Sequence, residues 1–170
     1  MKIAEKNNLR VIEDAAPALG AEFGNKMVGT FGDFGCFSFQ GAKLTVSGEG
    51  GVIVTNKDKL YKKIHLLASM GRTDSKAVFW SDSLGYQYTM ANLTAALALA
   101  QVERIEELIQ KKKEIYDCYR QELGNVRTIK FVKEYKNSKS VHCYPSILLT
   151  LLQDHQRSKK ILFGYHLQIQ

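Results

Sequence analysis

The chain has 170 residues, 45% of them apolar and 24% charged, a balance typical of a soluble globular protein with a core of its own. It holds no run of the roughly 20 apolar residues that a membrane span needs, and residues 1–10 are too polar for a signal peptide, so we predict a cytoplasmic protein. The net charge of +7 lies mainly in residues 101–170, where 13 basic side chains stand against 8 acidic ones.

The first part of the chain predicts short strands separated by glycines. Residues 2–8 are typical of the end of a surface helix, and the apolar run Leu9 to Ile12 predicts a buried parallel strand that delivers Glu13 and Asp14 at its carboxyl edge. Between residues 20 and 51 the glycines are frequent, and strands are expected at Cys36 to Phe39 and at Val52 to Thr55. Short strands interrupted by glycine indicate a close approach of the backbone to another group.

Helices dominate the middle of the chain. Asn56 is expected to cap a helix that continues to about Leu67, and residues 71–88 form a long irregular connection. A long helix is predicted from about Met90 to Leu123, linking two domains or kinking partway, with Gly124 ending it. Strands are expected at 126–132 and 144–152, and residues 153–170 show no clear period. Helices interleaved with buried strands indicate an α/β fold.

The basic character of the second half allows a binding module for polyanions, but its pattern favours another interpretation. Lys111 to Lys113 follow Glu103, Glu106 and Glu107 at helical spacing, and Glu107 stands four residues before Lys111. That arrangement is typical of a solvated helix face, so nucleic acid is not an expected partner. The cysteines Cys36, Cys118 and Cys143 lack the spacing of a metal site, so no metal is predicted and free thiols are expected.

One constellation could carry chemistry. Pyridoxal phosphate (PLP) requires a primary amine for a Schiff base, a carboxylate that keeps its pyridine nitrogen protonated, and donors for its phosphate. Lys43, Asp14 and Ser38 could supply these in turn. Lys43 has small or apolar neighbours, so desolvation is expected to lower its pKa. Each residue also has a simpler interpretation: a surface lysine, a turn-capping aspartate and a serine bonded to nearby backbone. Spacing alone leaves PLP as one candidate among several.

Several separated motifs occur together in a fixed order over residues 1–125. They are Val11-Ile12-Glu13-Asp14-Ala15-Ala16, Gly29-Thr30-Phe31-Gly32-Asp33, Phe37-Ser38-Phe39 with Lys43, Gly48-Glu49-Gly50-Gly51, Leu84-Gly85-Tyr86 and Met90-Ala91-Asn92-Leu93. Together they resemble the DegT/DnrJ/EryC1/StrS family of sugar aminotransferases, and most closely its perosamine-synthase-like members.

This resemblance implies a partial PLP-dependent aminotransferase fold of the aspartate-aminotransferase type (fold type I). Residues 1–100 would be the C-terminal part of the large, PLP-binding domain, 101–125 a connecting helix and 126–170 an incomplete small domain. It also implies a homodimer and a role in cell-surface polysaccharide (O-antigen or lipopolysaccharide) synthesis. The reaction would move an amino group from glutamate to a nucleotide-linked 4-keto-6-deoxy sugar.

The family's roles transfer to individual residues. Lys43 matches the Schiff-base lysine, Asp14 the acid at the pyridine nitrogen and Ser38 the serine near the cofactor phosphate. Gln87 stands where members usually carry an asparagine that reaches the phosphate in the neighbouring subunit. Pro17 stands where many members have a Gln or His near the ring hydroxyl, and proline provides no such donor.

Length is the largest departure from the family, because its members are more than twice as long. Met1 would fall within the helix before the Asp14 strand, which is expected of a truncated or frameshifted gene product. Two alternatives to an active enzyme therefore remain. One is a non-catalytic fragment or assembly partner of a full-length relative, and the other is the basic binding module.

Overall fold

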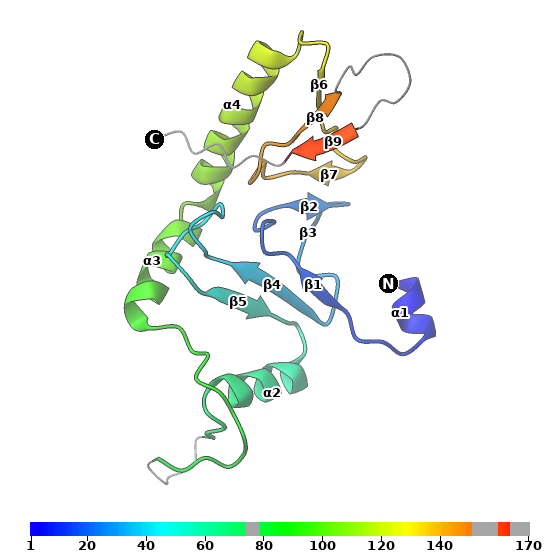
Figure 1. Ribbon diagram of the computed structural model, residues 1–170. Helices are drawn as coiled ribbons and strands as arrows, with labels where there is room; N and C mark the ends of the chain where they lie inside the picture. The colour runs from blue at the N-terminus through cyan, green and yellow to red at the C-terminus, as the bar shows by residue number, and fades with distance from the viewer. Residues whose placement is uncertain (74–78, 151–159, 164–170) are drawn as a thin grey trace.

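The computed structural model describes residues 1–73, 79–150 and 160–163. In this part of the chain, four helices accompany three small sheets, and α4 runs alongside the third sheet while α2 lies below the first (Figure 1). The helices are α1 (Lys2–Lys6), α2 (Asp58–Ala68), α3 (Asn92–Val102) and α4 (Ile105–Leu123). Among the helices that the structure describes, none is long and apolar enough to cross a membrane.

The first sheet has the strand order β1-β4-β5, formed by Ile12–Asp14, Phe34–Ser38 and Gly51–Val54. β1 runs parallel to β4, and β4 runs antiparallel to β5. The predicted strand was misplaced, since β1 begins at Ile12 and not at Leu9. It is also not buried: the Ile12 side chain is 66% exposed, because β1 has β4 on one side and no strand on the other within the described residues.

The second sheet brings together two distant parts of the chain in the order β3-β2-β7, formed by Lys26–Met27, Glu22–Phe23 and Ser138–Lys139. Gly24 and Asn25, both at positive φ, form the two-residue turn between β2 and β3, a geometry that matches the twist of a hairpin. Lys139 pairs with Glu22 at 3.0 Å. None of these three strands was predicted from the sequence.

The third sheet has the order β6-β8-β9, formed by Ile129–Phe131, Ile147–Thr150 and Lys160–Phe163. β6 and β8 lie inside the two predicted strands and confirm their positions, although residues 151 and 152 fall outside the described residues. β9 was not predicted. Its four residues pair with β8 in an antiparallel register, and so short a segment carries no recognisable period.

The predicted long helix is two helices. Arg104 has a non-helical backbone between α3 and α4, and its guanidinium bonds both oxygens of Glu107 at 3.0 Å. Glu107 also pairs with Lys111 at 2.7 Å, which confirms the predicted solvated face of α4. The expected cap at Asn56 was wrong, because α2 begins after Lys57.

The buried core joins α4 to two loops. Leu44, Val141 and Cys143 form its centre, and Ala21, Ile105, Leu108 and Ile109 pack against them. Burying a leucine side chain of this kind contributes about 2 kcal/mol. The core therefore fixes the segment around Leu44 against the segment around Cys143, although about a hundred residues separate them in sequence.

Candidate active site

Lys43 lies in a loop (residues 40–48) that is fixed at both ends. The loop returns to its start through a parallel bridge between Gln40 and Gly48, and the Lys43 amide donates to the Gln40 carbonyl at 2.9 Å. Next to Lys43, Leu44 and Thr45 are buried. This anchoring holds the backbone of Lys43 in one position. A residue that must bind a ligand in a defined geometry requires such a fixed backbone.

The Lys43 residue is half-buried, and charged and polar groups lie near its amine. Its Nζ lies 5.3 Å from the centroid of the Tyr144 ring. Hydrogen bonding to the Tyr144 hydroxyl raises the pKa of Lys43 above the ordinary 10.5; desolvation opposes the rise, while Cys143 and Asp14 add to it. The predicted lowering of this pKa was therefore wrong, because the hydrogen bond to the charged form outweighs desolvation.

Asp14 ends β1 with an exposed carboxylate. Its Oδ1 accepts a hydrogen bond from the Ala16 amide at 3.2 Å, so the side chain does cap the following turn. Of the groups that raise the pKa of Lys43, this carboxylate has the smallest influence. The structure thus places the carboxylate and the amine within electrostatic range of each other.

Ser38 ends β4, the strand next to β1. In the parallel register Asp14 lies opposite Cys36, and Ser38 follows two residues later, so Asp14 and Ser38 share one face of the sheet. The Ser38 Oγ accepts a hydrogen bond from the Gln40 amide at 3.3 Å, at the start of the loop that carries Lys43. Three predicted residues therefore converge on the carboxyl edge of β1 and β4.

Gln87 lies elsewhere, on the segment between α2 and α3. It is exposed, forms an antiparallel bridge with Ser69, and donates from Nε2 to the Thr89 hydroxyl at 2.8 Å. In the described part of the chain, no contact joins it to Lys43, Asp14 or Ser38. Pro17 is exposed in the turn after β1.

Glu13 is a structurally important residue that was predicted at the strand end but was given no role from the sequence. Its carboxylate accepts hydrogen bonds from the amides of Gly29, Phe31 and Gly32 at 2.6 to 2.8 Å. The glycine-rich loop is thereby fixed beneath β1, and a side chain at Gly35 would collide with the Gly29 backbone. The glycines were predicted to let the backbone come close to another group. At these positions that group is another backbone segment of the same chain.

Asp33 forms a buried acidic centre. Its carboxylate accepts from the Val11 amide at 2.8 Å and pairs with Lys57 at 2.5 Å and Arg10 at 2.9 Å. These bonds hold the pKa of Asp33 far below its ordinary value, and the bond to Lys57 has the largest effect. Asp33 fastens the start of β4 to the segments before β1 and α2, at the end of these strands opposite to Asp14 and Ser38.

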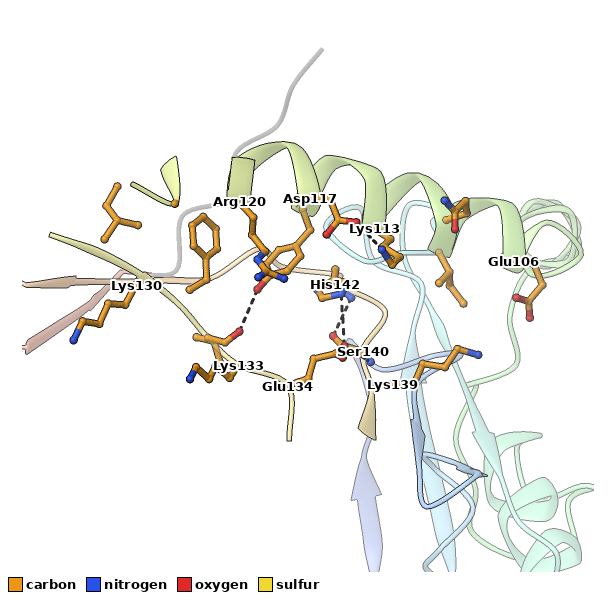
Figure 2. A pocket seen from close by; sticks show the side chains of 17 residues that line it. Glu106, Lys113, Asp117, Arg120, Lys130, Lys133, Glu134, Lys139, Ser140 and His142 are labelled. Carbon is orange, nitrogen blue, oxygen red and sulfur yellow. Dashed lines mark hydrogen bonds and ion pairs between the residues drawn. The ribbon is translucent and has the colours of Figure 1, made fainter. Parts of the chain in front are cut away.

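A large groove of about 910 Å³ lies away from these residues, between α4 and the segments 129–134 and 139–142. Figure 2 shows Lys113, Asp117 and Arg120 reaching from α4 toward Glu134 and His142. Lys113 pairs with Asp117, and the His142 ring stacks on Tyr116 with centroids 4.1 Å apart. Burial lowers the pKa of His142. None of the predicted cofactor residues lines this groove.

The fold agrees with comparisons to known proteins. The structure superimposes on Helicobacter pylori PseC, an aminotransferase involved in pseudaminic acid biosynthesis, with a TM-score of 0.80 and 30% identity, over 87% of this chain and 40% of that one. This likeness defines a sugar aminotransferase fold and confirms the predicted α/β class as a partial fold. The match described as the DegT/DnrJ/EryC1/StrS aminotransferase family covers residues 1–165. The chain belongs to this family.

Two curated relatives refine the family placement. The chain is 40% identical over 145 residues to the GDP-perosamine synthase of Escherichia coli O157:H7, covering 85% of this chain and 38% of that protein. It is 35% identical over 136 residues to the putative pyridoxal phosphate-dependent aminotransferase EpsN of Bacillus subtilis, covering 79% of this chain and 34% of that one. The predicted resemblance is confirmed, and the chain spans little more than a third of either relative.

Proposed function

We propose that this chain carries the lysine-bearing part of a PLP-dependent sugar aminotransferase. The reaction would transfer an amino group from glutamate to the keto carbon of a nucleotide-linked 4-keto-6-deoxy sugar of the perosamine type. The supporting observation is the position of the Lys43 amine, on an anchored loop within electrostatic range of the Asp14 carboxylate. A cytoplasmic location, a homodimer and a role in cell-surface polysaccharide synthesis remain parts of this proposal.

The residues at the edge of the first sheet suit the proposed cofactor. PLP supplies an aldehyde that binds an amine and a protonated ring that withdraws electrons from the bound substrate. Lys43 offers the amine, and the exposed Asp14 carboxylate would hold the ring nitrogen's proton. Ser38 offers a hydroxyl donor for the phosphate at the end of β4.

Lys43 has two chemical capacities at this place. The neutral amine can attack a carbonyl carbon, and the charged ammonium can carry and release a proton. Since the Tyr144 hydrogen bond favours the charged form, the Nζ must lose a proton before it can attack. Gln87, by the family resemblance, would act across a dimer interface on the cofactor phosphate of the second subunit.

A second candidate is a non-catalytic fragment that assembles with a longer relative. Its support is the exposed apolar surface of α3 and the preceding segment, where Leu93 is 78% and Trp80 63% exposed. A helix that is apolar on all sides is normally buried, so this surface calls for a covering partner. The basic binding module has less support, because Lys111 and Lys113 are paired with acids on α4.

Adding PLP to the purified chain separates the two candidates. The enzyme proposal expects a new visible absorbance band that bleaches with glutamate and is lost in Lys43→Ala. Lys62→Ala, which removes an exposed lysine from α2, is the matched control and should keep the band. A folded chain that gives no band would reject the enzyme proposal and favour the fragment.

A further inference from the structure

Lys43 and Tyr144 meet because the residues beside them share one core. Leu44 and Cys143 are each 6% exposed and belong to the same buried cluster. Burial raises the pKa of the Cys143 thiol, and the nearby Leu44 backbone opposes that rise. The 40–48 loop and the segment 141–144 are thus joined directly, one residue away from the amine and the phenol.

The two side chains are then in contact. The amine lies 5.3 Å from the centroid of the aromatic ring, within the range of a cation–π contact, and the phenol oxygen is near enough to favour the charged form of the amine. The titratable groups that act on Lys43 are Tyr144, Cys143 and Asp14. Tyr144 is the largest influence, and with 36% of its surface exposed it is open to solvent and to reagents.

We propose that Tyr144 is a positioning residue for Lys43: its ring and hydroxyl hold the charged amine beside the Asp14 edge until a carbonyl ligand arrives. This inference rests on the proposed function of Lys43. The contact restrains a long flexible side chain, which lowers the entropy that ligand binding must remove. It also retains the proton on Nζ, so release of the amine from Tyr144 is coupled to its deprotonation.

The consequence can be measured without the cofactor. Competitive acetylation by trace acetic anhydride, followed by peptide mass spectrometry across a pH series, reports the fraction of neutral amine at each lysine in one sample. In Tyr144→Phe the ring remains and the hydroxyl bond is lost, so Lys43 should react roughly 3- to 10-fold faster at neutral pH. In Tyr144→Leu the aromatic face is lost as well, and the rate should rise further.

Two controls accompany this experiment. Lys62 is an internal reference whose rate should not change, and Tyr61→Phe removes the hydroxyl of an exposed tyrosine on α2. Circular dichroism and thermal unfolding show whether each variant keeps the fold. If Tyr144→Leu fails to fold, Tyr144→Phe alone decides, because it retains the ring and its packing.

The outcomes distinguish this inference from the function on which it rests. An unchanged Lys43 rate and pH midpoint in Tyr144→Phe overturn the positioning role, even if PLP binds to Lys43 in both proteins. A faster Lys43 in Tyr144→Phe, together with a PLP band in the wild type, supports both. If Lys43 is acetylated faster in Tyr144→Phe but the wild type gives no PLP band, the contact between Lys43 and Tyr144 exists but serves no carbonyl ligand. This result also overturns the positioning role.

Discussion

Two regions of the molecule differ in how much of their apolar surface is buried by other residues of this chain. The loop of residues 40–48 is bridged at its ends, anchored by Leu44 and joined to the segment 141–144. The surface of α3 and residues 79–91 presents large apolar side chains to solvent. Around Lys43 the chain thus supplies its own packing, whereas α3 requires a surface from elsewhere. Binding chemistry and assembly should therefore be separable by mutation.

The largest expected effect comes from the anchor of the lysine loop. Leu44→Ala should lower the free energy of unfolding by about 2–5 kcal/mol, because it leaves a cavity among Val141, Cys143 and α4. Leu93→Ala on exposed α3 should change it by less than about 0.5 kcal/mol. Urea unfolding of the two variants compares the regions directly. Equal losses would contradict the contrast between them.

The acid sensitivity of the fold should depend on Asp33. Its pKa in the folded chain lies far below the ordinary 3.8, so its paired carboxylate stabilises the fold above about pH 4. That stability is lost as the pH falls from there toward the folded pKa. Thermal unfolding of Asp33→Asn should therefore show a weaker pH dependence below pH 4 than the wild type.

Glu107 provides the comparison for Asp33. Arg104 and Lys111 lower its pKa to about 2, but its side chain is 45% exposed and solvent screens these pairs. Glu107→Gln should therefore alter the acid unfolding profile less than Asp33→Asn does. A larger effect from Glu107→Gln would show that the helix pairs, and not the buried centre at Asp33, control acid stability.

The exposed surface of α3 should govern self-association. Replacing Leu93 and Leu97 together by serine removes apolar area that is in contact with solvent, so light scattering at high protein concentration should fall while the unfolding free energy changes little. The matched control is Leu60→Ser on α2, a half-buried position where stability should fall instead. Unchanged scattering in the α3 variant would mean that another surface associates.

The smallest effect is expected at Gln87. Gln87→Ala removes an exposed hydrogen bond to Thr89, worth at most about 0.5 kcal/mol to the fold. If Gln87 acts across a dimer, the variant should bind PLP more weakly only at protein concentrations where dimers form. Titration with PLP at low and high protein concentration tests this, and an equal affinity of both proteins at both concentrations would reject the role.

The sequence predicts best where local chemistry determines structure. The apolar runs around Cys36 and Val52 gave strands in place, and the acids after Ile12 were correctly assigned to a strand end. A kink partway along the long helix was one expectation, but its position at Arg104 was not predicted, because the apolar stripe continues across it. β2, β3 and β7 are two-residue strands held by backbone pairing between distant segments, which leaves no periodic pattern to find.

In the candidate site, too, features set by nearby sequence were predicted correctly and features set by distant contacts were not. Lys43, Asp14 and Ser38 were chosen from types and motifs, and the structure brings them to one edge. The direction of the Lys43 pKa was wrong because its partner, Tyr144, lies about a hundred residues away and comes near only through the core. Neighbours in sequence predict desolvation, whereas contacts made by folding determine the hydrogen bond that outweighs it.

The central claim is that the Lys43 amine binds the aldehyde of PLP, and its position can be read directly. The chain is mixed with PLP, the adduct is reduced with borohydride, and the modified peptide is located by mass spectrometry. The account predicts that the modification lies on Lys43 and on no comparable fraction of the exposed lysines such as Lys62. A modification spread evenly over the surface lysines, or none on Lys43, would contradict it.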